Sequence, residues 1–145
     1  MRDSSYNARI LFLGAAVLLC VALALLIRHT QALPRGPLPI VWDREACAEC
    51  RMHVGEPRFA GQLQTRDGQV LDFDDPGCLL RYLATRKPNV HAVYFHHLTQ
   101  EQWLPLSEVA FTDVEGTPMG YGLGVVSAGT PGAISMQAAL ARVTR

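Results

Sequence analysis

The sequence predicts an α+β fold, a small antiparallel-sheet domain that follows an N-terminal transmembrane helix. Two observations predict it: an uninterrupted apolar run from Ile10 to Ile27, and short alternating patterns beyond it that enclose one amphipathic helix pattern. The chain has 145 residues and no net charge, and no basic stripe indicates nucleic-acid binding. We therefore divide it into a membrane anchor (1–28), a Pro-rich linker (29–42) and a folded domain (43–145).

The apolar run from Ile10 to Ile27 contains 18 residues and no charge. A membrane-spanning helix needs about 20 apolar residues, with a lower bound near 17, whereas the apolar core of a cleavable signal peptide has about 7–15. The length favours an uncleaved, single-pass anchor in the inner membrane. Because this run is the first apolar segment and a folded domain follows it, we expect the N-terminus inside and the domain outside the cytoplasm. Two alternatives stay open: a signal peptide cleaved near Thr30-Gln31-Ala32, and a lipoprotein acylated at Cys20, for which the preceding Leu18-Leu19 is a poor match.

The first half of the folded domain predicts the order strand, strand, helix, strand. The residues of its first two predicted strands alternate between the two faces of a sheet. The turn Arg66–Gln69 joins these strands, and its Asp-Gly pair is a strong hairpin signal. Asp75 can accept hydrogen bonds at the start of the helix, and Pro76 suits the first helical position. The predicted elements are Arg58–Thr65, Val70–Asp74, a helix from Pro76 that ends before Pro88, and Val90–Leu98.

The second half predicts a partial echo of this order. Glu108–Thr112 and Leu123–Ser127 have strand composition, and a turn at Thr130–Gly132 precedes helical spacing from Ile134 to Val143. The two halves show no clear repeat by identity.

The densest set of metal-binding side chains is the loop Cys47-Ala-Glu-Cys50-Arg-Met52-His53. Two thiols three residues apart can surround one ion, and Met52 adds a thioether. Soft sulfur ligands select Cu(I) over hard ions. Met119 lies in a Pro-Met-Gly loop that should expose its side chain, and we expect it to fold back onto the cysteine loop. The sequence thus predicts a Cu(I) site of Cys47, Cys50, Met52 and Met119.

The CxxC pattern has other interpretations. A structural zinc site usually has four ligands, so Cys78 and one histidine would have to complete it. Thiol–disulfide exchange would use Cys47 as the attacking thiol and Cys50 as the resolving thiol, although no βαβ setting surrounds them. A structural disulfide is permitted outside the cytoplasm.

Cys78 itself is interpreted as a small apolar residue in the first turn of a helix, a position that would lower its thiol pKa if it were exposed. No nucleophile elbow, HExxH motif or phosphate-binding glycine loop is present, so we expect a binding protein rather than an enzyme.

The order of these motifs resembles the NosL family of copper chaperones for nitrous-oxide reductase assembly. The resemblance runs from about Cys47 to about Val126 and rests on Cys47-Ala-Glu-Cys50-Arg-Met52, Asp67-Gly68, Phe73-Asp74-Asp75, Gly77-Cys78 and Pro118-Met119-Gly120.

The resemblance implies two ββαβ units similar to those of organomercurial lyase. It implies a periplasmic, membrane-tethered protein that binds one Cu(I) and delivers it to a copper-enzyme apo-protein or its ABC-type maturation complex. Cys50, Met52 and Met119 are the ligands that it carries over. The chain departs from the family at Arg51, where glycine is typical, and in having an apolar helix instead of a lipid anchor. A related copper enzyme, such as a terminal oxidase, therefore stays open as the client.

Overall fold

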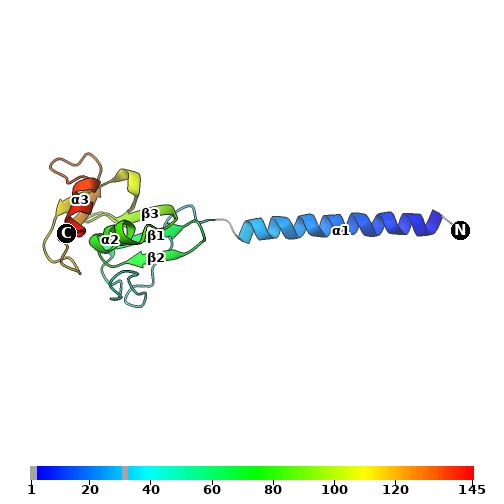
Figure 1. Ribbon diagram of the computed structural model, residues 1–145, viewed down its shortest axis with the longest axis horizontal. Coiled ribbons are helices and arrows are strands. Elements are labelled where there is room, and N and C mark those ends of the chain that lie inside the picture. Colours follow the sequence, from blue (N-terminus) through cyan, green and yellow to red (C-terminus); the bar gives the residue numbers. More distant parts are fainter. Residues whose placement is uncertain (1–2, 31–32) are drawn as a thin grey trace. The chain divides into compact units, whose positions relative to one another are not determined.

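The computed structural model describes residues 3–30 and 33–145 and divides the chain into two units, Met1–Leu33 and Pro34–Arg145 (Figure 1). Helix α1 (Asp3–Thr30) forms the first unit, and its described side chains, from Phe12 to Ile27, are exposed. The predicted helix is thus confirmed, but its predicted passage through a membrane is not supported. Spanning needs about 20 apolar residues, and in the part of the chain that the structure describes no helix is both long and apolar enough.

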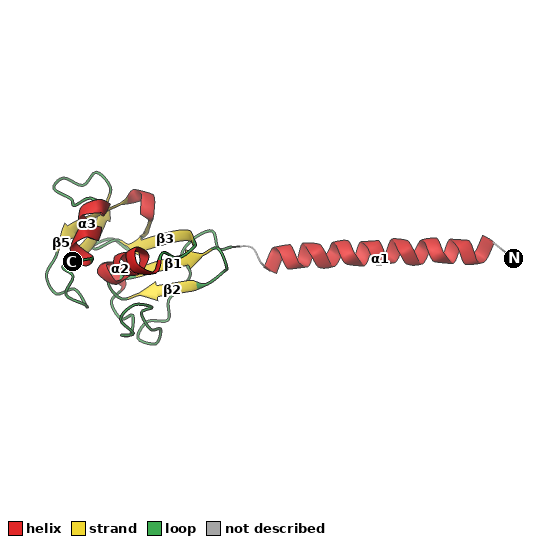
Figure 2. Ribbon diagram, viewed as in Figure 1, coloured by secondary structure: helices red, strands yellow, loops and turns green. Residues whose placement is uncertain are grey.

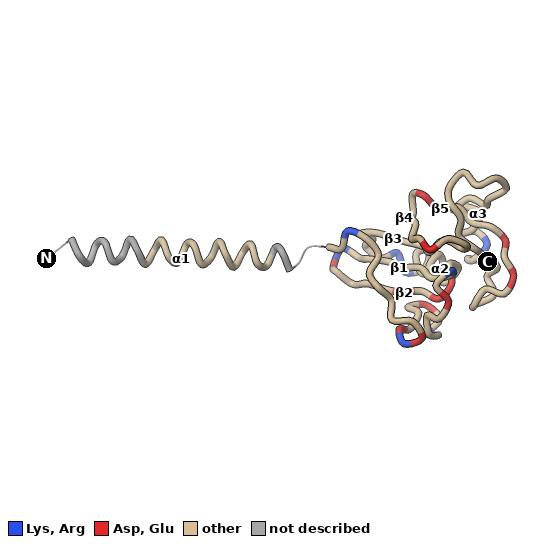
Figure 3. The backbone as a smooth tube through the Cα atoms, turned by 180° about the vertical axis from the view of Figure 1, so that it is seen from behind, with Lys and Arg blue, Asp and Glu red and all other residues tan. Residues whose placement is uncertain are grey.

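The second unit is an α+β domain with a four-stranded antiparallel sheet and a separate two-stranded hairpin (Figure 2). The sheet has the strand order β2-β1-β3-β4, and helices α2 and α3 pack against one another. Acidic and basic positions are mixed along its backbone (Figure 3). The elements are β1 (Gly61–Thr65), β2 (Val70–Phe73), α2 (Pro76–Arg86), β3 (Val90–His96), β4 (Trp103–Pro105), β5 (Val109–Asp113), β6 (Leu123–Ser127) and α3 (Met136–Val143), with 3-10 turns at Pro57–Phe59 and Leu106–Glu108.

The predicted ββαβ order of the first half is confirmed, and local chemistry explains its boundaries. Gly68 takes a φ of +88° in the turn between β1 and β2, which only glycine adopts readily. Asp75 caps α2 by accepting a hydrogen bond from the Gly77 N–H at 2.7 Å. Lys87 ends the helix in the left-handed conformation. The strand β4 was not predicted, because three residues are too few to show a period.

The second half differs from the expected ββαβ unit. It consists of the hairpin β5–β6 followed by α3, and no strand follows α3 in the described residues. Ile134 pairs with Phe111 only through an isolated bridge. The second half of the domain is therefore ββα, and the prediction of two complete ββαβ units is wrong in this respect.

The apolar core lies between the sheet and its helices. Leu63, Leu79 and Phe95 are fully buried, and the rings of Phe95 and Phe111 meet edge to face at 5.6 Å. Gly61 allows Leu79 of α2 to pack closely on β1, because a Cβ at position 61 would lie 2.7 Å from a methyl carbon of Leu79. One face of β1 is thereby covered by α2.

The opposite face of β1 is polar and holds the linker. Gln62 and Gln64 are fully or almost fully buried although they are amides. Gln62 bonds both backbone groups of Leu38, accepting from its N–H at 2.7 Å and donating to its carbonyl at 3.1 Å. Gln64 donates to the Gly36 carbonyl at 2.7 Å. Residues 36–38 are therefore fastened to the sheet and belong to the folded unit.

Candidate metal centre

The loop that carries Cys47 and Cys50 is closed by backbone hydrogen bonds. The Cys47 N–H donates to the Met52 carbonyl at 2.8 Å, and the Arg51 N–H donates back to the Cys47 carbonyl at 3.0 Å. Arg51 has a φ of +68°, in the left-handed region. Glycine adopts this region readily, so the loop keeps a glycine-like backbone despite the larger side chain.

A further hydrogen bond attaches this loop to the sheet. The Ala48 N–H donates to the Asp72 carbonyl of β2 at 2.9 Å. Because β2 leads directly into the start of α2, the loop lies beside the first turn of that helix. Cys78 is in this turn.

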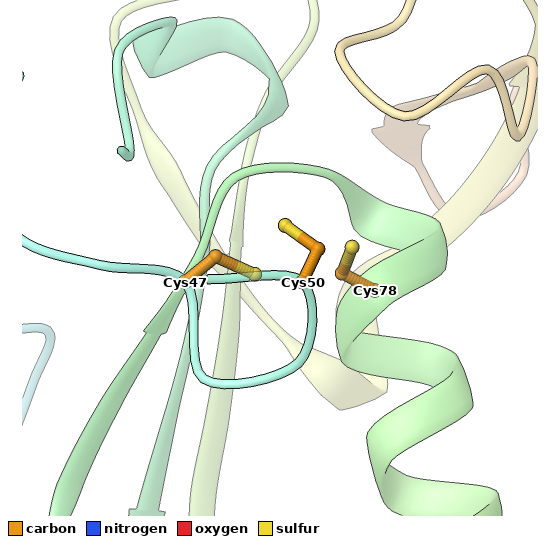
Figure 4. A group of neighbouring side chains, drawn as sticks. All are labelled: Cys47, Cys50 and Cys78. Carbon is orange, nitrogen blue, oxygen red and sulfur yellow. The ribbon is translucent and has the colours of Figure 1, made fainter. Parts of the chain in front are cut away.

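The sulfur atoms of Cys47, Cys50 and Cys78 all lie within 4.8 Å of one another. Figure 4 shows the three thiols converging from the loop and from the start of α2. Cys47 and Cys78 are 0% and 1% exposed, and Cys50 is half-buried. A reagent or ion therefore reaches the cluster most directly past Cys50.

The three thiols have different proton affinities. The Cys78 thiol donates a hydrogen bond to the sulfur of Cys47 and lowers the pKa of Cys47 to about 5, against the opposing effect of burial. Backbone N–H groups of Cys50, Asp74 and Glu49 also favour the Cys47 thiolate. Donation of the same hydrogen bond raises the pKa of Cys78, and burial raises that of Cys50. Of the three thiols, Cys47 therefore loses its proton most readily.

Two buried carboxyl groups lie near the thiolate. Burial is the main cause that raises the pKa of both Asp74 and Asp75, and the negative charge of Cys47 adds to it. Asp74 accepts from the Gly55 N–H at 3.3 Å, so only Asp75 caps the helix. This concentration of negative charge favours a bound cation.

Three converging thiols could hold a metal ion. Soft thiolate ligands suit Cu(I), zinc and iron–sulfur clusters. Structural zinc is almost always four-coordinate, yet no fourth histidine, cysteine or carboxylate joins the group within the described residues. Three sulfur ligands match the low coordination numbers that Cu(I) accepts.

The two predicted thioether ligands lie at the surface. Met52 is 57% exposed and Met119 is 40% exposed. The Met119 N–H donates to a carboxylate oxygen of Asp75 at 3.0 Å, so its loop lies against the first turn of α2, the turn that contains Cys78. The participation of Met52 and Met119 stays a prediction.

Sequence reasoning underestimated Cys78, which it treated as a packing residue. The signal was present, because Asp75 and Pro76 predicted a helix whose first turn contains this thiol. The neighbouring His53 does not belong to the thiol group, and its Nδ1 lies 2.6 Å from the Asp43 carbonyl oxygen.

Comparison of the chain with protein-family models, curated protein sequences and solved structures finds no match.

Proposed function

We propose that this protein is a Cu(I)-binding chaperone that holds one ion with the thiols of Cys47, Cys50 and Cys78 and passes it to a copper enzyme. The observation that carries the proposal is the convergence of three sulfur atoms within 4.8 Å. Two of these thiols are buried and one is half-buried. Such a site retains the ion yet leaves one side open to an incoming ligand.

Exchange of ligands is the mechanism that fits this site. An acceptor thiol or thioether can approach past Cys50 and bind the ion before a donor sulfur of this protein leaves it. Met52 and Met119, both exposed, would supply additional thioether contacts to the ion before and during this step. The ion then never has to be released into water.

The order of motifs resembles the NosL family. This resemblance supports delivery of the ion for the maturation of nitrous-oxide reductase or of a related copper enzyme, such as a terminal oxidase. The recipient would be the apo-enzyme or its ABC-type maturation complex. The exposed apolar side chains of α1, from Phe12 to Ile27, are the feature that would hold the protein at a membrane. The periplasmic side is the location that this resemblance favours.

Titration of the full-length, reduced chain with Cu(I) in detergent tests the proposal. We expect one tightly bound ion per chain, measured by competition with a colorimetric Cu(I) chelator. Cys78→Ser should weaken binding by about 100-fold or more, because loss of a ligand should exceed the 10–100-fold cost of removing an outer-shell partner. Cys20→Ser is the matched control, since Cys20 lies in α1 and outside the thiol cluster.

Two results would contradict the proposal. One is parent-like Cu(I) affinity in a variant with serine at all three clustered positions. The other is a marked preference of the chain for Zn²⁺ together with unfolding on chelation, which would identify a structural zinc site.

A thiol–disulfide oxidoreductase that keeps a client's copper-site thiols reduced is the second candidate. The lowered pKa of Cys47 favours it, because a thiolate is the attacking species. Its complete burial opposes it, because attack also requires access. Turnover with a model disulfide that depends on Cys47 and Cys50 but is unchanged in Met119→Ala would favour this candidate over the chaperone.

A further inference from the structure

The loop from Thr117 to Gly122 packs on the first turn of α2 through several contacts. The Met119 N–H donates to Asp75 Oδ2 at 3.0 Å. The Tyr121 ring lies against Gly77, where a Cβ would collide with it. The Tyr121 hydroxyl lies 3.5 Å from a guanidinium nitrogen of Arg81, one turn further along the helix.

Asp75 connects this loop to the helix because its two carboxylate oxygens have separate tasks. Oδ1 accepts from the Gly77 N–H at 2.7 Å and caps α2, whereas Oδ2 accepts from the Met119 N–H. The Thr117 hydroxyl also bonds the Asp75 side chain, and the same hydroxyl accepts from the Gly122 N–H at 3.1 Å. Asp75 itself is fully buried.

We infer that Asp75 is a positioning residue that holds the Thr117–Gly122 loop against the first turn of α2, which contains Cys78, and so keeps Met119 near the thiol cluster. A helix cap alone requires one acceptor, and serine or threonine can provide it. The second acceptor is used only by the loop. The two halves of the domain, which come from separate parts of the sequence, therefore meet at this carboxylate beside the candidate metal centre.

Asp75→Ser separates the two tasks. Serine retains an N-cap acceptor, but its shorter side chain lacks the second carboxylate oxygen that accepts from Met119. Ser135→Ala is the matched control, because Ser135 caps α3 by accepting from the Ala138 N–H and lies outside the thiol cluster. Urea unfolding of both variants shows whether general stability explains any effect.

The first measurement uses the reduced, metal-free chain and so does not depend on the proposed function. Each cysteine is followed by mass spectrometry during alkylation with iodoacetamide. Asp75→Ser should speed the alkylation of the buried Cys78 about tenfold, the effect expected for loss of one hydrogen bond to a charged group. Ser135→Ala should leave the rate unchanged. An unchanged rate in Asp75→Ser would overturn the inference.

The second measurement rests on the proposed function and compares Cu(I) affinity in Asp75→Ser, Met119→Ala and the double variant. Each single variant should weaken Cu(I) binding about tenfold, the usual lower effect of removing a supporting partner. If Asp75 acts through Met119, the double variant should bind as Met119→Ala does. Multiplication of the two single effects would show that they are independent and would overturn the positioning role. Failure of the parent chain to bind Cu(I) would instead refute the proposed function and leave the alkylation result to decide the inference.

Discussion

Two regions of the domain, the outer face of β1 and the start of α2, bury polar or polarisable side chains in different ways. On the face away from α2, Gln62 uses its amide oxygen and nitrogen fully, bonding Leu38, Gln64 and Asp72. Near the start of α2, the three clustered thiols mainly face one another and nearby backbone N–H groups. The Gln62 amide is fully bonded within the described residues, although the neighbouring Gln64 Oε1 is buried there without a partner. The thiol cluster, by contrast, can still accept an ion.

This difference separates structural from functional burial. A buried amide stabilises the fold only while its partners are present, so the Gln62 side favours one fixed conformation. Thiols are weak hydrogen-bonding groups, so packing them together contributes little directional energy. We therefore expect substitution of Gln62 to alter stability and substitution of the clustered cysteines to alter metal binding.

The largest expected effect on stability comes from Gly77→Ala. The added Cβ collides with the Tyr121 ring and must displace the loop from α2. We expect the free energy of unfolding to fall by about 2–3 kcal/mol, in the range for overpacked sites, as measured by urea denaturation. Gly36→Ala is the control, since a Cβ there meets nothing within 4 Å. Equal stability of the two variants would contradict the observed packing.

The next effect tests the opposite face. Gln62→Ala leaves the Leu38 backbone N–H without its acceptor and removes a donor from Asp72. Unfolding should become easier by about 2 kcal/mol, the cost of unsatisfied buried groups. Cu(I) affinity should change by no more than about twofold, because Gln62 bonds the Asp72 side chain whereas the thiol loop bonds the Asp72 backbone carbonyl. A loss of affinity comparable to that of Cys78→Ser would remove the distinction between the two regions. Gln102→Ala, at an exposed position, is the matched control.

A smaller effect should appear as a dependence of stability on pH. Burial, reinforced by the Glu45 carboxyl group, raises the pKa of Asp72 from its ordinary value of 3.8 to about 7. The folded state therefore binds the proton more tightly, and this stabilisation is complete below about pH 4 and is lost as the pH rises towards 7.

Asp72→Asn removes this titration and keeps an acceptor for Gln62. At pH 8 the variant should be more stable than the parent by roughly 1 kcal/mol, allowing for the screening of a partly exposed group. Urea midpoints measured between pH 4 and pH 8 should show a smaller decline in the variant. Identical slopes in the two proteins would exclude Asp72 as the responsible group.

The smallest expected effect is an increase in the free energy of unfolding. Arg51 holds a φ of +68° in the thiol loop, where a non-glycine residue is strained. Arg51→Gly removes strain of about 1–2 kcal/mol and adds chain entropy to the unfolded state, so we expect a net stabilisation of about 0.5 kcal/mol. Gly68→Ala at a φ of +88° should show the reverse sign by the same urea assay. Destabilisation by Arg51→Gly would indicate that the guanidinium makes a contact that offsets the strain.

Local signals predicted most of the first half of the fold. Alternation, the Asp-Gly turn and the Asp75-Pro76 helix start were sufficient, because each acts over a few residues. The paired thiols of Cys47 and Cys50 were visible for the same reason. That Cys78 joins these two thiols could not be predicted in this way. The Ala48–Asp72 hydrogen bond brings the thiol loop to the start of α2, and it joins residues 24 positions apart without any local signature. The hydrogen bonds between Gln62 and Leu38 likewise join residues that are 24 positions apart in the chain.

The grip of Gln62 and Gln64 on residues 36–38 has a consequence for engineering. The two glutamines bond backbone amide and carbonyl groups of the linker, and none of its side chains takes part in these bonds. Binding through backbone groups does not depend on which side chains residues 36–38 carry. A short peptide of different composition that can adopt the same extended shape is therefore a reasonable graft at this place, for example to carry an affinity tag or a spectroscopic label.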